Sequence, residues 1–136
     1  MNQFIRVFPA ILLAFNGVVY VAIGIIFSLD AERWFGNVGV TLVDPVGFTE
    51  LRAVYGGLML AMGIFFLLSI RVRNWLVPGT AFLLISYFGL VLARSQGIFL
   101  LGQSTPVIMQ IYLIEWVCLI LSALALRVAS RAQKTV

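Results

Sequence analysis

VFPAILLAFNGVVYVAIGIIFSL, residues 7–29, is a run of 23 residues without a charged side chain. A helix needs about 20 apolar residues to cross the hydrocarbon layer of a membrane, which is about 30 Å thick. The run is longer than the apolar core of a secretory signal peptide, and no small-x-small cleavage site precedes Asp30. We therefore predict a membrane-spanning helix that is retained in the protein.

Further charge-free runs follow this first one. They cover residues 53–70, 74–93, 95–114 and 116–126. A β-barrel would require alternating polar and apolar residues, and these runs do not alternate. We predict an all-α fold, a four-transmembrane-helix antiparallel bundle that forms one integral membrane domain over residues 1–136. The spans are expected at about 8–29, 51–70, 75–94 and 106–127, and the fourth should begin at Pro106 behind Ser104 and Thr105 as capping residues.

The composition supports a membrane protein and excludes several chemistries. Hydrophobic residues make up 62% of the chain, the mean hydropathy is +1.11, and charged residues make up only 10%, whereas a soluble domain carries roughly 25%. The chain has no His and a single Cys, Cys118, which excludes His-ligated haem, zinc or copper and a thiol-disulfide oxidoreductase. We therefore predict no metal, no cofactor and no catalytic residue.

The distribution of charge predicts the orientation in the membrane. The net charge is +4, but the basic residues lie at the ends of the apolar runs, which indicates membrane topology and not a nucleic-acid partner. One side has no acidic residue and collects Arg6, Arg71, Arg73, Arg127, Arg131 and Lys134. By the positive-inside rule, both termini are cytoplasmic and the long loop between the first two helices lies outside.

This outer loop, residues 30–49, is the one long connection. Trp34 and Phe35 indicate a continuation of the first helix that turns to lie in the membrane interface. Regular structure is then expected to break at Gly36, Gly39, Pro45 and Gly47. The segment is either a plain connection between two spans or a lid over a site.

Small residues predict where the helices approach closely. In lipid, association depends on close contact through small side chains. We predict packing through Ala53, Gly57 and Ala61, which recur every four residues, with Gly56 beside them, and through Gly89. Gly17 and Gly24 are one heptad apart on the first span. The second-span row could serve contacts within the bundle or between protomers of a homo-oligomer.

Charged residues near the apolar runs form the candidate site. Glu115 lies near the middle of the fourth span, where a charge costs about 3 kcal/mol on insertion scales. We expect Arg94 or Arg52 to neutralise it, because both are long cations near the outer ends of neighbouring spans. The predicted polar network is Glu50, Arg52, Tyr55, Tyr87, Arg94 and Glu115.

Each charged member also has a purely structural interpretation. Glu50 could be a first-turn acid that complements a helix dipole. Arg94 could extend to the interface without a partner. Glu115 could belong to an ion pair that only holds the helices together.

The motif TELRAVYGGL, residues 49–58, taken with Arg94 and Glu115, resembles the bacterial four-helix membrane family named domain of unknown function 4345. The shared core is E-L-R-A-x-Y-G-G, with an arginine ending the third helix and a glutamate in the fourth. The connection SQGIFLLGQST, residues 95–105, departs from the family because it lacks an acidic residue next to glycine. The resemblance implies a multi-pass protein of the bacterial cytoplasmic (inner) membrane, and it implies no particular activity.

Three functions remain open from the sequence. The first is a binding or accessory membrane protein whose outer polar cavity holds a membrane lipid headgroup, a quinone-like molecule or a partner helix. The second is a proton-coupled small multidrug exporter, although exporters of that kind carry their carboxylate in the first helix. The third is an enzyme for a lipid-soluble substrate, which would depend on Glu115 and a tyrosine alone. We expect binding rather than catalysis.

Overall fold

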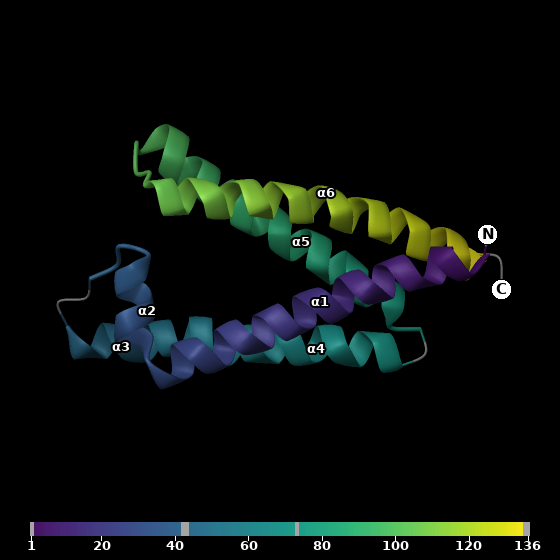
Figure 1. Cartoon of the computed structure of the whole chain (residues 1–136), viewed down its shortest axis with the longest axis horizontal. Coiled ribbons are helices and arrows are strands. Elements are labelled where there is room, and N and C mark those ends of the chain that lie inside the picture. Colours follow the sequence, from purple (N-terminus) through teal and green to yellow (C-terminus); the bar gives the residue numbers. More distant parts are fainter. Residues whose placement is uncertain (1, 42–43, 73, 135–136) are drawn as a thin grey trace. The chain divides into compact units, whose positions relative to one another are not determined.

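Helices make up nearly all of the computed structural model (Figure 1), which describes residues 2–41, 44–72 and 74–134. No β-strand occurs within these ranges. The elements in chain order are α1 (Asn2–Leu29), α2 (Ala31–Asn37), α3 (Pro45–Leu51), η1 (Arg52–Leu58), α4 (Met59–Arg71), α5 (Leu76–Ser95), η2 (Gln96–Leu100) and α6 (Pro106–Lys134), where η marks a π-helix.

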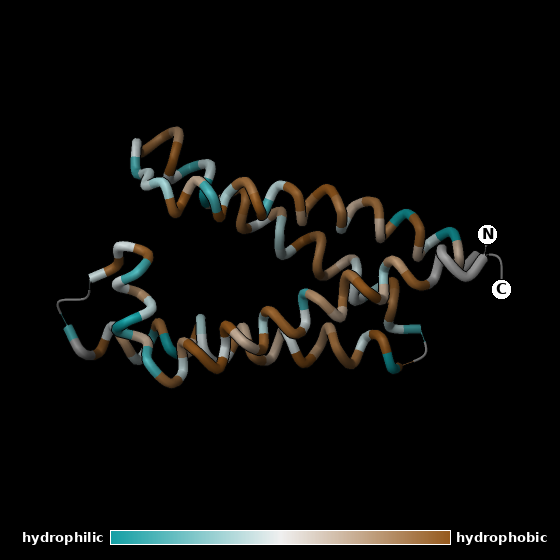
Figure 2. Tube along the Cα trace, viewed as in Figure 1, coloured by the Kyte–Doolittle hydropathy of each residue, from teal (hydrophilic) through white to brown (hydrophobic). Residues whose placement is uncertain are grey.

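Among the residues that the structure describes, four continuous helical stretches are long and apolar enough to cross a membrane. They are Val7–Leu29, Val46–Arg71, Leu76–Leu100 and Pro106–Ala132. Figure 2 shows apolar residues along the length of these helices. The predicted all-α class with four membrane-crossing helices is confirmed, although the last three stretches are longer than the sequence indicated. Proline does open the fourth helix, and Thr105 Oγ1 accepts a hydrogen bond from the Ile108 N–H at 3.2 Å.

The second helical stretch begins earlier than predicted because Asp44 caps it. The Asp44 carboxylate accepts a hydrogen bond from the Val46 N–H at 2.9 Å, and Pro45 occupies the first turn, where a missing N–H costs nothing. Gly47 therefore lies inside α3 instead of breaking regular structure. Glu50 likewise lies beyond the first turn, so its interpretation as a first-turn acid is wrong.

The connection between the first two spans, residues 30–49, contains a helix of its own. Asp30 ends α1 and caps α2, since its carboxylate accepts a hydrogen bond from the Arg33 N–H at 3.2 Å. The predicted continuation of the first helix is thus a separate short helix, and Gly36 lies inside it. Gly39 does leave the helical conformation, with φ at +81°, which glycine adopts without a steric penalty.

Two π-helical segments lie where the sequence predicted either an ordinary helix or a loop. In η1 the backbone N–H at Met59 reaches the carbonyl of Val54, five residues earlier. At the end of η2 the Leu101 N–H donates to the Gln96 carbonyl at 3.2 Å. The connection after Arg94 is therefore helical as far as Leu100. π-Helical turns are rare and are often found at functional sites.

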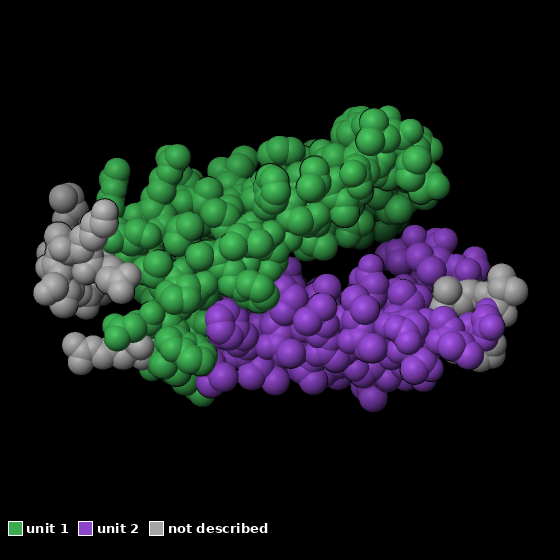
Figure 3. Space-filling model, turned by 180° about the vertical axis from the view of Figure 1, so that it is seen from behind, with its two compact units in different colours: residues 1–13, 69–136 green, residues 14–68 purple. Residues whose placement is uncertain are grey.

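The chain divides into two compact units, coloured separately in Figure 3. Unit 1 consists of residues 1–13 and 69–136, and unit 2 consists of residues 14–68. A single integral membrane domain over residues 1–136 stays a prediction.

Glycines bring two helices of unit 2 into backbone contact. A Cβ added at Gly63 would lie 2.7 Å from the Val21 backbone nitrogen, and one added at Gly24 would lie 2.7 Å from that of Leu60. Gly17 and Gly56 are equally closely packed. Because Gly56 and Gly63 are one heptad apart, they match the heptad spacing of Gly17 and Gly24 on α1.

Of the residues predicted for helix packing, Gly56 makes such a contact and the others do not. Ala53, Gly57 and Ala61 are exposed, as is Gly89 on α5, and a Cβ added at Gly57 or Gly89 would meet nothing within 4 Å. Gly57 directly follows Gly56, so the row that contains it lies about a quarter turn around the helix from the glycines that contact α1. The packed face of this helix in unit 2 is Gly56 and Gly63, and a role for the exposed row between protomers stays a prediction.

Unit 1 is built around the packing of α5 on α6. The short turn that precedes α5 contains Asn74, whose φ of +75° is one that asparagine tolerates better than most residues. Gly79 then allows close approach to α4, since a Cβ there would lie 2.5 Å from the Ser69 Cβ.

Candidate functional site

The centre of the site is an ion pair between the end of α5 and the interior of α6. Arg94 Nε donates to Glu115 Oε2 at 2.7 Å. The Glu115 side chain is only 7% exposed, whereas that of Arg94 is 30% exposed. A buried carboxylate without a partner would be strongly destabilising, and a charge-assisted hydrogen bond removes that cost. Of the two arginines considered as partners, the structure pairs Arg94 with Glu115.

Helical periodicity places both charges on the faces where α5 and α6 pack. Along α5 and η2 the buried residues Tyr87, Val91 and Ile98 lie three or four positions from one another or from Arg94. On α6 the buried residues before and after Glu115 include Tyr112, Ser122 and Ala125. These intervals follow one side of an α-helix. Both members of the pair therefore lie on the helix faces that are mostly covered, and Arg94 remains partly accessible.

A second polar contact lies beside the pair. The hydroxyl oxygens of Ser95 and Tyr112 are 3.0 Å apart. Ser95 Oγ also donates to the Val91 carbonyl at 2.7 Å. Because a serine hydroxyl has a single hydrogen to donate, Tyr112 must be the donor to Ser95. The two contacts together join α5 to α6 at neighbouring positions on each helix.

Apolar and aromatic side chains surround Tyr112. It belongs to a buried cluster with Val91 and Ile98. The Tyr112 ring also contacts Phe99 and Trp116 edge to face, with ring centroids 6.1 and 6.3 Å apart. Such contacts hold the ring in place, so the polar atoms of the site are fixed by a packed apolar surround.

The ion pair leaves polar atoms unused. Within the part of the chain that the structure describes, the only hydrogen bond of the Arg94 guanidinium is the one from Nε, and Glu115 Oε1 has no donor. Yet no buried side-chain nitrogen or oxygen lacks a partner in these same residues. The two terminal amino groups of Arg94 and Glu115 Oε1 are therefore accessible from outside.

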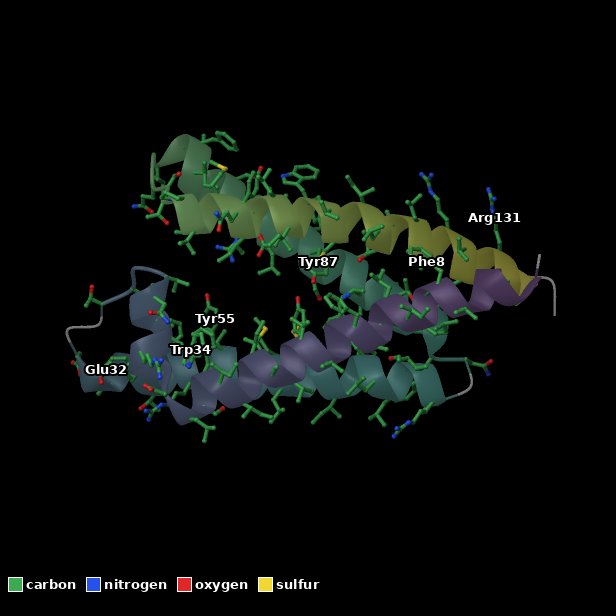
Figure 4. All side chains as sticks on the ribbon, viewed as in Figure 1. Phe8, Glu32, Trp34, Tyr55, Tyr87 and Arg131 are labelled. Atoms are coloured by element: carbon green, nitrogen blue, oxygen red, sulfur yellow. The ribbon has the colours of Figure 1, made fainter. Side chains whose placement is uncertain are left out.

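Tyr87 lies in the same unit as the pair. It is buried on α5, two helical turns before Arg94, and is labelled in Figure 4. The three other predicted network residues belong to unit 2: Glu50 lies in α3, and Arg52 and Tyr55 lie in η1.

In unit 2 these three side chains are exposed. Neither Glu50 nor Arg52 forms an ion pair within residues 2–41, 44–72 and 74–134. Tyr55 is held by aromatic contacts instead: its ring centroid lies 5.5 Å from that of Phe27 and 5.1 Å from that of Phe35. Figure 4 shows Tyr55 beside α2, the helix that carries Trp34.

Sequence reasoning did not identify Tyr112 and Ser95. The available signals were spacing and adjacency: Tyr112 precedes Glu115 by three residues on one helix face, and Ser95 follows Arg94 directly. No group of three or more His, Cys, Asp or Glu side chains comes together among the described residues. The site thus offers hydrogen-bond donors and acceptors on a neutral ion pair.

Comparison with known proteins identifies one family. A family model with the description "Domain of unknown function (DUF4345)" matches residues 8–126. Neither the curated proteins nor the solved structures contain a match to the chain. The matched residues include all of η1 and both members of the ion pair.

Proposed function

The chain belongs to the DUF4345 family, whose description names no activity, and from this starting point we propose that it binds the polar head of an amphiphilic molecule at Arg94 and Glu115. In this proposal the protein spans the bacterial inner membrane four times, and the site opens toward the outer leaflet. Its partners are membrane lipids or a lipid-like molecule. Tyr87, on α5 in the same unit, is proposed to contribute to the same polar region.

The single hydrogen bond between Arg94 and Glu115 is the observation that supports this proposal. Arg94 approaches Glu115 through Nε alone, so the amino end of its guanidinium is unpaired within the described residues and accessible. An arginine that served only to neutralise Glu115 would gain most from a two-bonded contact with the carboxylate. The unpaired amino groups in an apolar surround support a ligand that supplies oxygen acceptors.

The exporter alternative has less support. An exporter of this kind needs a carboxylate that alternates between a proton and a cationic drug, whereas Glu115 already holds a guanidinium at 2.7 Å. The alternative of an enzyme gains no support either, because the hydroxyl of Tyr112 donates to Ser95 instead of facing a base.

The test compares amphiphiles that co-purify with three forms of the protein. Wild type, Arg94→Gln and Arg127→Gln are purified from native membranes in a mild detergent, and bound molecules are identified by mass spectrometry. Arg127 is a matched control, since it is an exposed cation on the same helix as Glu115 and lies twelve residues beyond it. We expect an enriched amphiphile in wild type and Arg127→Gln that is lost in Arg94→Gln. Equal recovery from all three forms would reject the proposal.

A further inference from the structure

We infer that the ligand has a neutral head that carries carbonyl oxygens, as in a quinone or the ester region of an uncharged glycerolipid. This inference rests on the proposed function, because it names the chemical class of the ligand at that same site. It follows from the charge and the hydrogen-bonding capacity of the Arg94–Glu115 pair.

The net charge of the site limits which ligands it can hold. Arg94 and Glu115 carry opposite charges and are 2.7 Å apart, so the site has no net charge before a ligand arrives. Glu115 is also the only acidic residue in unit 1. An anionic head would leave one uncompensated negative charge in a medium of low dielectric constant, which is strongly unfavourable. A neutral head preserves the balance.

The hydrogen-bonding groups of the site determine what the ligand must supply. A guanidinium has five N–H donors, of which only Nε is engaged within the described chain. The hydroxyl of Tyr112, one helical turn from Glu115 on α6, already donates to Ser95. The site therefore offers mainly N–H donors, so its ligand must supply acceptors. Carbonyl oxygens are the acceptors that carry no charge.

The surroundings of the pair include exposed aromatic residues. Phe99 and Trp116 flank Tyr112, and these two residues are 68% and 41% exposed. Exposed aromatic faces beside polar donors suit a molecule that has an apolar body and a polar edge. Both a quinone and an uncharged glycerolipid have such a structure.

The experiment measures ligand-dependent thermal unfolding of the full chain in maltoside detergent with three probes. They are a short-chain ubiquinone, a neutral diacylglycerol and the anionic lipid phosphatidylglycerol. For wild type and Arg127→Gln, we expect a neutral probe to raise the unfolding midpoint at lower concentration than the anionic lipid does. Which neutral probe acts at the lower concentration identifies the source of the carbonyl group.

Two variants test the physical basis. Glu115→Gln removes the negative charge while keeping the shape of the side chain, so the unbalanced Arg94 should now favour phosphatidylglycerol over the neutral probes. Arg94→Lys keeps the charge but loses the planar array of donors, and it should weaken binding of the neutral probe about tenfold or more. If Glu115→Gln does not fold, Arg94→Lys still tests whether binding of the neutral probe depends on the guanidinium.

The outcomes separate this inference from the proposed function. Tighter binding of phosphatidylglycerol to wild type, with loss in Arg94→Lys, would overturn the neutral ligand class and leave the site in place. An unchanged preference in Glu115→Gln would also overturn it. If no probe produces a shift that depends on Arg94, both the ligand class and the binding site are rejected.

Discussion

At the residue scale, the sequence predicted that Glu115 needs a cation but left two arginines open. Predicted depth in the membrane did not separate Arg52 from Arg94, because both were expected at the outer ends of their helices. The pairing follows from a short connection, residues 101–105, which joins the end of η2 to the start of α6. In an antiparallel helix pair, residues at similar distances from the connection face each other, and Arg94 and Glu115 satisfy this condition. Tyr112 and Ser95 satisfy it as well.

The contact between Arg94 and Glu115 predicts a measurable coupling. We expect Glu115→Gln and Arg94→Gln each to lower thermal stability in detergent, because each leaves one charge without its partner. The double variant should lose less than the sum of the single losses, with a coupling of about 1–3 kcal/mol in a double-mutant cycle.

The control cycle combines Glu115→Gln with Arg52→Gln. Since Arg52 has no ion pair in the described part of the chain, those two losses should add. Additive losses for Arg94 and Glu115 would contradict a stabilising ion pair.

At the element scale, the four membrane-crossing helices could be predicted because long apolar runs have one structural solution in lipid. The π-helical segments could not. A π turn uses the same residue types as an α turn and differs only in which carbonyl each N–H reaches. Which of two adjacent glycines faces a neighbouring helix could not be predicted either: Gly56 contacts α1, whereas Gly57 lies exposed in η1.

Two glycines of the second helical stretch provide a matched comparison. Gly63→Ala should lower stability by about 1–3 kcal/mol, because the new methyl group would lie 2.7 Å from the Val21 nitrogen and 2.8 Å from the Gly17 carbonyl oxygen. Gly57→Ala should be neutral or stabilising by up to about 1 kcal/mol, since a Cβ there meets nothing within 4 Å.

Thermal unfolding of both variants in the same detergent checks this difference. If Gly57→Ala proved the more damaging change, the packing face would instead be the exposed row with Ala53 and Ala61. A loss of oligomers in Gly57→Ala, with the stability of the monomer intact, would place that row between protomers.

At the scale of the whole molecule, the number and order of the helices follow from hydropathy, whereas orientation depends on charge alone. The acidic residues other than Glu115 all lie in unit 2, at positions 30, 32, 44 and 50. The side predicted to be cytoplasmic has only basic residues. This asymmetry is the physical basis for the prediction that both termini are cytoplasmic.

Cysteine labelling tests the orientation directly. In a Cys118→Ser background the chain has no other cysteine, so a single new one reports one position. With a membrane-impermeant maleimide and intact spheroplasts, we expect labelling of Asn37→Cys, an exposed residue at the end of α2. Lys134→Cys should react only after the membrane is permeabilised. The opposite pattern would reverse the predicted topology.

The π-helical segment η1 makes the number of residues in the second span as important as their chemistry. A π turn already accommodates one extra residue, so a deletion such as that of Gly57 could return the segment to α-helical geometry with its flanks nearly in register. Inserting a residue after Gly57 has no such outlet and would turn the preceding part of the helix by about 100° relative to the part that follows. Tyr55 would then leave the ring contacts with Phe27 and Phe35 that hold it. In this motif, a one-residue insertion would rearrange more of the surface than most substitutions, even though every side chain is preserved.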